Sequence, residues 1–455
     1  MKNQAPARDR RFAGDPMSFN AADRPPMSGA AGGDLAVNQY DVYFSRQPML
    51  DREGMLCGFE LLPRVIDQRD DPEKPGRPGK ALVSAFMARA VRGALTGHAA
   101  WLDVTRDFLF DDALLGLPPS RVMFELPPDI GSDPEVVSRL IQLHGRRYRF
   151  ALDHVTEADE SFAKLLPYVE AVKIDLNQIA PALLSKFASV LKAAGKILVA
   201  VGVESQADSD LAHELGFDRF QGYFFARPHK GARRASAPRQ ALLNLLQLLA
   251  SEPTVAQLEG ELKLNPVLVM HLMRLANSSS FGIGHKVTTL REAINATGTD
   301  RIARWTQLLL YADGRKVSLE DDPLLQLAAT RARFMELAAN QLSKARIAEQ
   351  DAAFLAGVFS CVDAVFGGPL EATIDMLTLA RPIRAAILNR DGVLGQLLSA
   401  AEALERADWT RLDEVCGQLA PLDAAAVAAI GLDAAEWAGM ADRATEATGL
   451  ERLDE

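Results

Sequence analysis

Residues 169–204 read VEAVKIDLNQIAPALLSKFASVLKAAGKILVAVGVE, and this stretch decides the fold of the N-terminal half of the chain. Its two ends, residues 169–176 and 197–203, are short apolar runs rich in β-branched residues, as in buried strands. Residues 181–194, which separate them, have the pattern of a helix. A strand, a helix and a second strand in this order form the repeating unit of a parallel sheet.

The same alternation extends on both sides, from residue 40 to residue 228. Eight strand candidates with helical stretches between most of them predict a (β/α)8-like barrel. The first two candidates are joined by DREG at residues 51–54, a hairpin-like turn, so we expect this opening pair to be antiparallel. The strand candidates are residues 42–50, 56–62, 99–104, 122–126, 150–155, 169–176, 197–203 and 219–225, and the helical stretches are residues 81–95, 134–143, 181–194 and 206–215.

Strand signals nearly vanish after residue 240. A broad apolar face is formed by Leu242, Leu243, Leu245, Leu246 and Leu249, and TVAQ at residues 254–257 is a capping box that opens the next helix. Further helix starts follow at short intervals, so the second domain is predicted to be all-α. The fold class is therefore α/β plus all-α, with a barrel followed by a helical bundle. The expected domains are a disordered tail at 1–38, a barrel at 39–228, a linker at 229–240 and a helical domain at 241–455.

Two segments allow no packed core of their own. Residues 1–38 are rich in Ala, Gly, Pro and Arg and contain almost no aromatic residues, which is typical of disorder. Residues 229–240 carry four Lys or Arg and no acid. They are either a solvated linker or a basic strip that contacts an acidic partner, and the linker is the simpler interpretation.

Composition excludes several classes of protein. The chain is 48% apolar and 24% charged, as in globular proteins, and its 50 Lys and Arg against 60 Asp and Glu give a net charge of −10. This balance argues against general binding to nucleic acid or to an anionic membrane. The three cysteines lie far apart and indicate no disulfide framework. Neither a signal peptide nor an apolar run long enough to span a bilayer is present, so we expect a cytoplasmic protein.

Polar residues recur where the barrel strands end. In a parallel barrel these ends converge on one mouth, where reactive groups usually lie. Several carboxylates at one mouth repel one another unless a cation neutralises them, and their hard oxygens suit Mg²⁺, Mn²⁺ or Ca²⁺. Alternatively, some of these carboxylates only pair with Arg64, Lys173 or loop amides. The strand-end residues include Glu60, Asp103, Glu125, Asp153, Lys173, Asp175, Glu204 and Gln221.

Four segments resemble, in the right order, the motifs of EAL-domain cyclic di-GMP phosphodiesterases: CGFELLPR at 57–64, KID at 173–175, GVE at 202–204 and FQGYFFARP at 220–228. The resemblance implies a barrel whose mouth binds the cyclic dinucleotide, with two divalent ions activating a water for attack on a phosphodiester. By position, Arg64 matches the residue that meets a phosphate, and Lys173 the lysine near the attacking water. The candidate nucleotide-binding residues are Glu60, Arg64, Lys173, Glu204 and Gln221, and the candidate metal ligands are Glu60, Asp103, Glu125 and Asp153.

The chain departs from this family pattern at several positions. Asp103 stands where the family has an asparagine ligand, and His154 replaces the second of two adjacent aspartates. Val201 occupies the place of the glutamate that resembles the family's general base, and Pro128 replaces another glutamate. Loss of an essential acid or base typically costs ~10² to ~10⁴ in rate, so we expect negligible turnover.

The helical half resembles the HDOD domain, a relative of the HD phosphohydrolases. The resemblance rests on NPVLVMHLMRLANSSSFG at 265–282, VTTLREAI at 287–294 and Gly298. HD enzymes hold their metals with an adjacent His-Asp pair. After residue 240 the sequence contains only His271 and His285, and neither precedes an aspartate, so no HD-type metal centre is expected.

These observations predict a non-catalytic cytoplasmic signalling protein. It would act through protein contacts made by the HDOD domain, would sense cyclic di-GMP through the barrel, and would require no cofactor beyond at most one Mg²⁺ or Mn²⁺. A homodimer is also compatible with the resemblance. Two alternatives stay open: an active cyclic di-GMP phosphodiesterase with a rearranged metal site that uses His154, and an inert scaffold that binds no nucleotide.

Overall fold

A computed structural model describes most of the chain. The tail expected at residues 1–38 and nearly all of the linker expected at 229–240 lie outside the described residues. So does most of the segment at 265–288, which carries the first HDOD-like motif. The described residues are 40–67, 79–228, 239–264, 268–269, 272, 275–276, 287, 289–310, 321–343, 347–376 and 379–443.

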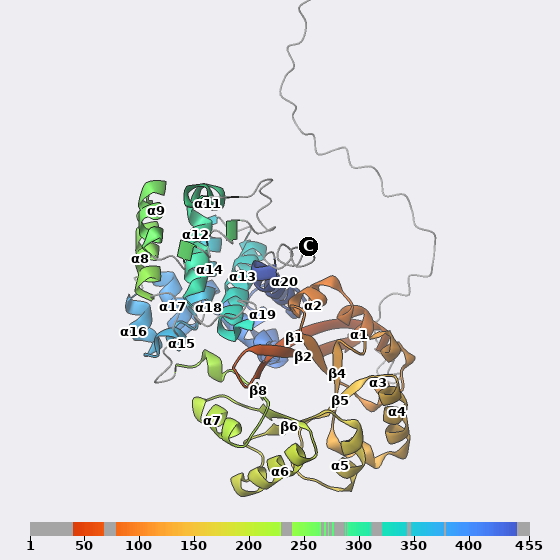
Figure 1. Ribbon diagram of the computed structural model, residues 1–455. Coiled ribbons are helices and arrows are strands. Elements are labelled where there is room, and N and C mark those ends of the chain that lie inside the picture. Colours follow the sequence, from red (N-terminus) through yellow and green to blue (C-terminus); the bar gives the residue numbers. More distant parts are fainter. Residues whose placement is uncertain are drawn as a thin grey trace, which may run out of the picture. The chain divides into compact units, whose positions relative to one another are not determined.

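Eight strands close into a barrel in the order in which they occur along the chain (Figure 1). Strand β1 is antiparallel to both of its neighbours, β2 and β8, whereas β2 to β8 pair in parallel. The predicted barrel and the predicted antiparallel opening are therefore confirmed. The strands are β1 (Tyr40–Asp51), β2 (Leu56–Asp67), β3 (Ala99–Asp103), β4 (Val122–Leu126), β5 (Arg149–Leu152), β6 (Ala171–Asp175), β7 (Ile197–Val201) and β8 (Arg219–Gln221).

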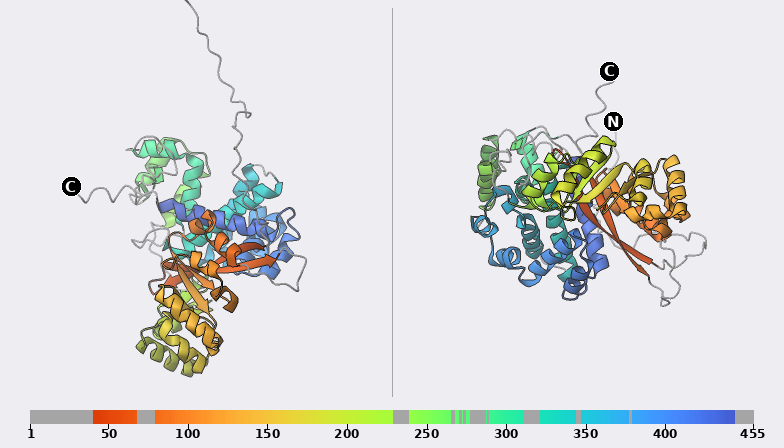
Figure 2. Two further views of the ribbon diagram at one scale, coloured as in Figure 1. Left: turned by 90° about the vertical axis from the view of Figure 1, so that its right-hand side faces the viewer. Right: turned by 90° about the horizontal axis from the view of Figure 1, so that it is seen from below.

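Strand β2 is longer than the sequence predicted. Its parallel ladder with β3 reaches Leu61, opposite Leu102, but its antiparallel ladder with β1 continues to Asp67, opposite Tyr40. The expected end at residue 62 was wrong because two ladders overlap on one strand, and only the parallel one stops near the mouth. The β1–β2 hairpin thus extends beyond the barrel, beside α19 and α20 (Figures 1 and 2).

Helices follow most of the barrel strands. The stretch expected as one helix at 81–95 forms two, α1 (Gly79–Phe86) and α2 (Arg89–Ala94). Strand β8 ends at Gln221 because Gly222 turns the backbone to φ +146°, and a short 3-10 helix, η4 (Phe224–Ala226), follows. The other barrel helices are α3 (Arg106–Leu109), α4 (Pro134–Gly145), α5 (Glu160–Leu165), α6 (Pro181–Ala193) and α7 (Gln206–Glu214), with 3-10 turns η1 (Asp112–Gly116), η2 (Pro128–Ser132) and η3 (Leu166–Tyr168).

Every element described after residue 238 is a helix, as expected for the second domain. The capping box at Thr254 and Gln257 is present and opens α9. The helices are α8 (Arg239–Leu249), α9 (Val255–Lys263), α11 (Leu290–Thr297), α12 (Thr299–Leu309), α13 (Pro323–Ser343), α14 (Ile347–Phe359), α15 (Asp363–Phe366), α16 (Leu370–Met376), α17 (Arg381–Asn389), α18 (Gly392–Glu405), α19 (Trp409–Cys416) and α20 (Ala424–Arg443). None of the described helices has both the length and the apolar character needed to cross a bilayer.

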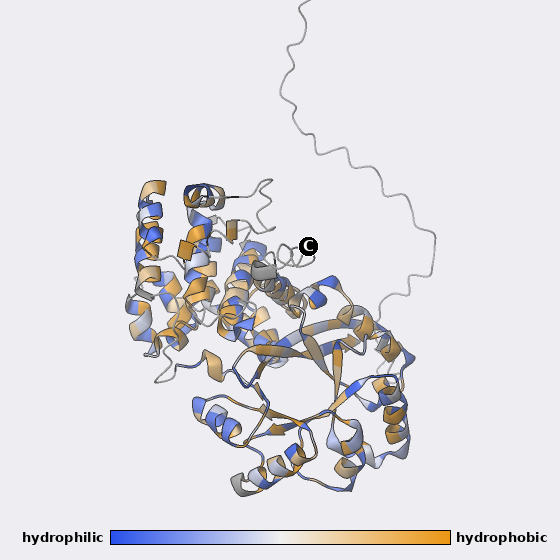
Figure 3. Ribbon diagram, in the orientation of Figure 1, coloured by the Kyte–Doolittle hydropathy of each residue, from blue (hydrophilic) through white to orange (hydrophobic). Residues whose placement is uncertain are grey.

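Buried apolar residues form a core in both the barrel and the helical region. Figure 3 shows hydrophobic residues, in orange, on the strands and on the helices of both regions. One small cluster lies inside the barrel and is composed of Met49, Trp101, Met123, Ala151, Ala171 and Val199. Each of these six residues either lies two positions from a polar mouth residue on the same strand or pairs with such a residue on a neighbouring strand. Side chains two apart on a strand share a face, so this apolar layer forms the floor beneath the mouth.

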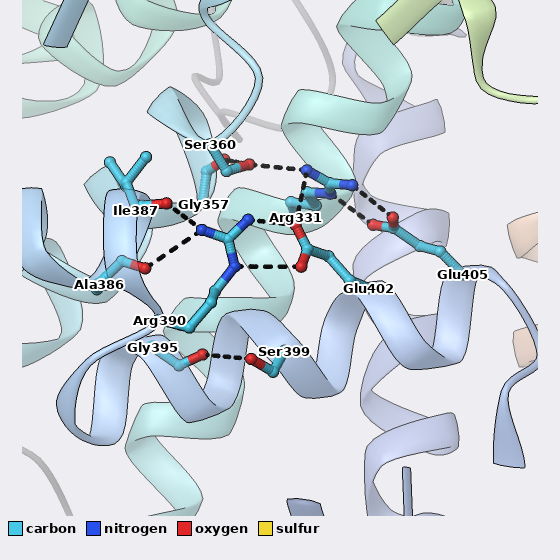
Figure 4. Close-up of polar contacts among 10 residues, drawn as sticks. All are labelled: Arg331, Gly357, Ser360, Ala386, Ile387, Arg390, Gly395, Ser399, Glu402 and Glu405. Carbon is cyan, nitrogen blue, oxygen red and sulfur yellow. Dashed lines mark hydrogen bonds and ion pairs between the residues drawn. The ribbon is translucent and has the colours of Figure 1, made fainter. Parts of the chain in front are cut away.

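A buried ionic network ties helices of the second region together (Figure 4). Arg331 of α13 is 9% exposed and makes two hydrogen bonds of 2.7 Å to the carboxylate of Glu405 and one of 3.0 Å to Ser360. Arg390, at the end of α17, donates to both oxygens of Glu402 on α18. The same part of α18 reaches the barrel, because the Tyr223 hydroxyl donates to the carbonyl oxygen of Glu405 at 2.9 Å.

Candidate functional site

The strand register brings one polar layer together at the mouth. Gln47 of β1 pairs with Glu60 of β2, and Asp103 of β3 pairs with Glu125 of β4. Each of these residues is two positions from a member of the apolar floor on the same strand, or pairs with one on a neighbouring strand. Because side chains alternate along a strand, the two layers lie on the same inner face of the barrel. The layer comprises Gln47, Glu60, Asp103, Glu125, Asp153, Lys173, Val201 and Gln221.

Lys173 is the centre of this layer. Its side chain is 2% exposed, and its ammonium nitrogen lies 2.8 Å from Glu60 Oε2, 2.9 Å from Glu125 Oε1 and 3.4 Å from Asp153 Oδ2. Burial opposes the charge of Lys173, but Glu125, Glu60 and Asp153 outweigh it and raise the pKa of the lysine well above its usual value. Lys173 therefore stays charged and holds three carboxylates at one point.

Glu60 receives a second polar contact from Gln221. The Gln221 side-chain amide donates to Glu60 Oε2 and to Gln47 Oε1, the latter at 3.1 Å. Gln47 lies on the antiparallel strand β1, where no motif or strand-end position marked it in the sequence. Its place became apparent only from the register, in which it faces Glu60.

The layer carries more negative charge than its own cation can balance. The pKa of Glu125 is raised well above its usual value by burial, and Glu60, Asp153 and Asp103 add to the effect. Loss of hydration, with repulsion from Glu60 and Asp153, raises the pKa of Asp103 to about 6. Four carboxylates thus face one ammonium, an arrangement that favours a bound cation.

Asp153 and His154 follow directly after β5. Burial opposes ionisation of Asp153, but hydrogen bonds from His154 and the charge of Lys173 hold its pKa below the usual value. His154 Nδ1 lies 2.8 Å from Asp153 Oδ2, and this contact raises the pKa of the imidazole. His154 has a positive φ of 52°, and its side chain is 72% exposed. His154 thus acts as a hydrogen-bond partner of Asp153.

The donor set fits a divalent cation. Glu60, Asp103, Glu125 and Asp153 each offer an oxygen, and these oxygens all lie within 4.8 Å of one another. Glu125 Oε2 is buried and has no hydrogen-bond partner among the described residues. An all-carboxylate set suits Mg²⁺, Mn²⁺ or Ca²⁺, and a carboxylate at Asp103 keeps the hard oxygen that an asparagine would supply.

Two predicted nucleotide-binding residues lie outside this cluster. Glu204 is exposed beyond the end of β7, where its Oε2 lies 3.5 Å from Arg227 Nη2. Arg64 lies on the extension of β2 and forms two hydrogen bonds, of 2.8 and 2.7 Å, with the carboxylate of Asp413 on α19. This contact raises the pKa of Arg64 and lowers that of Asp413. No local pattern predicted this pair, because Asp413 is 349 residues further along the chain than Arg64.

Val201 places a half-buried aliphatic side chain in the mouth layer, as its position in the sequence predicted. Its register partner on β6 is Asp175. The Asp175 carboxylate accepts hydrogen bonds from the Asn177 amide at 2.9 Å and from the Gln178 side chain at 3.0 Å. The mouth therefore has a carboxylate directly beside the valine, outside the four-carboxylate cluster.

Comparisons with known proteins identify both halves of the chain. A family model of the EAL domain matches residues 105–228, and a model of the HDOD domain matches residues 237–367. The chain is 27% identical over 389 residues to the cyclic di-GMP phosphodiesterase CdgJ of Vibrio cholerae. The alignment covers 84% of this chain and 88% of CdgJ. It is 25% identical over 405 residues to the uncharacterized protein YuxH of Bacillus subtilis, covering 87% of this chain and 98% of YuxH.

Solved structures of EAL proteins are similar to part of the chain. The complex of Klebsiella pneumoniae BlrP1 with manganese and cyclic di-GMP matches with a TM-score of 0.33 and 19% identity, over 40% of this chain and 55% of BlrP1. The match thus spans about half of the BlrP1 chain. The EAL domain of Mycobacterium smegmatis DcpA matches with a TM-score of 0.33 and 22% identity, over 40% of this chain and 91% of that domain.

These findings correct the expectation that the chain is not an enzyme. CdgJ, which aligns with 84% of the chain, is named a phosphodiesterase. The structure also shows why the departures from the family pattern leave the carboxylate cluster in place. The substitution at Asp103 keeps an oxygen ligand in place, and the four carboxylates still converge around Lys173. No finding supports the expectation that the substituted motif positions make the mouth degenerate and inactive.

Proposed function

Because the chain combines an EAL domain with an HDOD domain, we propose that it is a cyclic di-GMP phosphodiesterase that cuts one phosphodiester of the dinucleotide at the barrel mouth. The single observation that carries the proposal is the group of four carboxylates around one buried lysine. The likeness to CdgJ over most of both chains supports the same activity.

We propose that Glu60, Asp103, Glu125 and Asp153 hold one or two divalent cations. Bound there, such ions would lower the pKa of a coordinated water and offset the charge of the phosphate. Because Glu125 has a buried oxygen without a hydrogen-bond partner among the described residues, its coordination displaces no existing bond.

The other residues of the mouth position these groups. Lys173 holds Glu60, Glu125 and Asp153 close together, and Gln221 fixes the orientation of Glu60. Arg64 offers a planar guanidinium, which matches a phosphate in two parallel hydrogen bonds. The residues that we propose to contact the dinucleotide or its ions are Glu60, Arg64, Lys173, Glu204 and Gln221.

We further propose that Asp175 accepts the proton of the attacking water. The family pattern has a glutamate where this chain has Val201, and Asp175 is the carboxylate in register with it. Hydrogen bonds from the Asn177 backbone amide at 2.9 Å and from the Gln178 side chain at 3.0 Å hold the Asp175 carboxylate in place. Replacing Asp175 with asparagine should lower the rate of hydrolysis by ~10² to ~10⁴.

The experiment is an assay of the purified full-length chain with cyclic di-GMP and Mn²⁺ or Mg²⁺, with the linear product measured by chromatography. Hydrolysis should stop when EDTA is added and should be lost in Glu125→Gln. Glu170→Gln is the matched control, because Glu170 immediately precedes β6 at the opposite end of the barrel and pairs with Arg149 at 2.7 Å. If the chain forms no linear product with either metal, the proposal is wrong.

Two further predictions concern the helical domain. Binding of a protein partner by this domain and formation of a homodimer both stay predictions of the sequence. Sedimentation of the full-length chain tests the dimer, which should appear as about twice the 49.4 kDa of the chain. His271 and His285 lie outside the described residues.

A further inference from the structure

Arg64 lies just beyond the mouth of the barrel. Leu61 is opposite Leu102, so the next residue of β2 is level with Asp103, and Arg64 follows two positions later. At ~3.3 Å per residue, this places the Arg64 backbone about 7 Å beyond the rim. Arg64 and Glu60 are four residues apart on β2, so their side chains lie on the same face of the strand. Glu60 points into the mouth layer.

The helical domain occupies the guanidinium group of Arg64. Nη1 and Nη2 donate to the two carboxylate oxygens of Asp413 at 2.8 and 2.7 Å. The Trp409 ring, also on α19, lies 5.6 Å from the guanidinium carbon and adds a cation–π contact. The pair is accessible to solvent, with 24% of the Arg64 side chain and 50% of the Asp413 side chain exposed.

A phosphate of the substrate would need the same two donors. Arg recognises carboxylate and phosphate with the same planar pair of N–H groups, so the two acceptors exclude each other at one guanidinium. We propose that Asp413 competes with a phosphate of the cyclic dinucleotide for Arg64, and that the helical domain thereby lowers the affinity of the barrel for its substrate. This inference rests on the proposed function.

The competition is weak enough to be reversible. Exposed ion pairs contribute little to stability, so removing the Asp413 charge should tighten substrate binding by about two- to fivefold. Trp409 would still contact Arg64 in such a variant. The coupling is also reciprocal: substrate that binds Arg64 must weaken the hold of β2 on α19 by the same factor.

The test compares full-length wild type with Asp413→Asn, Arg64→Ala and the double variant. Affinity for cyclic di-GMP is measured by calorimetry in EDTA, so that metal-dependent turnover does not consume the ligand, and KM is measured with Mn²⁺. Asp413→Asn should lower both Kd and KM about two- to fivefold with kcat unchanged. In the Arg64→Ala background the same change should have no effect, because the competing donor is absent.

Glu414→Gln is the matched control. Glu414 is the next residue of α19 and pairs with Arg411 at 3.0 Å. Its substitution removes one negative charge, as Asp413→Asn does, but leaves the contacts of Arg64 unchanged. Equal affinities of wild type, Asp413→Asn and Glu414→Gln would overturn the inference and leave the proposed function intact. Absence of both binding and hydrolysis in all of these proteins would overturn the proposed function, and the inference with it. Increased amide hydrogen exchange in α19 on addition of cyclic di-GMP is a second expected result, and unchanged exchange at saturating ligand would contradict the competition.

Discussion

Lys173 combines two requirements that normally conflict, burial and charge. A lysine with 2% of its side chain exposed stays protonated here only because three carboxylates lie within 3.4 Å of its ammonium group. The three carboxylates also depend on Lys173, because no other ammonium or guanidinium group among the described residues forms an ion pair with them. The lysine therefore contributes to folding as well as to the site.

Replacing Lys173 with methionine should lower the free energy of unfolding by about 3–5 kcal/mol, because it leaves buried carboxylates uncompensated. Thermal unfolding in EDTA measures this loss, and adding Mn²⁺ should recover part of it, since the ion binds the folded state. Lys192→Met is the control. Lys192 pairs with Asp218 at 2.6 Å but is 40% exposed, so its loss should cost less than about 1 kcal/mol. Equal effects of the two substitutions would contradict this account of Lys173.

The cysteine thiols provide a test of burial through pH. Burial raises the pKa of Cys57 to about 11 and that of Cys361 to about 12. Only the thiolate reacts, so below these values the folded chain should react more slowly than the unfolded chain, in which the thiols have ordinary pKa values. At pH 8 the difference for Cys57 should be about 100-fold, and it should shrink as the pH rises. Thiol titration with and without denaturant measures it, and similar rates at pH 8 would show that the thiols are accessible.

At the scale of elements, the turn after β8 connects the site to the second domain. Gln221 contacts Glu60 in the mouth, Gly222 turns the chain, and Tyr223 donates to the Glu405 carbonyl at the end of α18. Gly222 allows this change of direction because its φ of +146° disfavours any side chain, and a Cβ there would lie 2.1 Å from the Val203 carbonyl oxygen. Three consecutive residues thus serve the mouth, the turn and the domain contact.

Replacing Gly222 with alanine should therefore displace Gln221 and reduce both stability and activity. Strain of this kind costs about 1–3 kcal/mol, before the clash with Val203 is counted. Gly145→Ala is the control, because an added Cβ at Gly145, the last residue of α4, meets no atom within 4 Å. Unfolding by denaturant and the hydrolysis assay measure the two effects. A Gly222→Ala protein with wild-type stability and activity would show that the turn is not needed.

At the scale of the whole molecule, the barrel and the helices share buried contacts as well as the exposed Arg64–Asp413 pair. A cavity of about 70 Å³ lies between them, lined by residues of β1 and of the turn after β8 on one side and of α13, α18 and α20 on the other. Arg46 of β1 donates to Thr330 of α13 at 3.1 Å across this junction. Because the Arg331–Glu405 pair stands beside the same junction, we expect the two regions to unfold together.

Arg331→Met should lower the free energy of unfolding by about 3–5 kcal/mol by leaving Glu405 uncompensated. The matched control is Arg384→Met, because Arg384 pairs with Asp375 and Glu371 but is 39% exposed, so that its loss should lower the free energy of unfolding far less. Differential scanning calorimetry should show one transition in wild type and in both variants. Two separate transitions in wild type would contradict the shared unfolding of the barrel and the helices.

The sequence by itself determined the barrel, its antiparallel opening, the helical second domain and most of the mouth residues. These features follow from local patterns, namely the alternation of strands and helices and the rule that strand ends meet at one mouth. The same reasoning named Glu60, Asp103, Glu125 and Asp153 as ligands, and the structure brings their oxygens within 4.8 Å of one another. It failed on catalysis, because it counted substituted motif positions without knowing which contacts the remaining residues keep.

Tertiary packing alone determines which side chains contact or neutralise the charged groups of the mouth and Arg64. Gln47 joins the site through an antiparallel ladder, and Asp413, which contacts Arg64, is 349 residues further along the chain. Such contacts depend on how elements pack, and no local pattern of residues encodes them. The charge state of Lys173 likewise depends on three strands converging around it, since an ammonium group keeps its proton in a buried site only where opposite charges lie within a few ångströms.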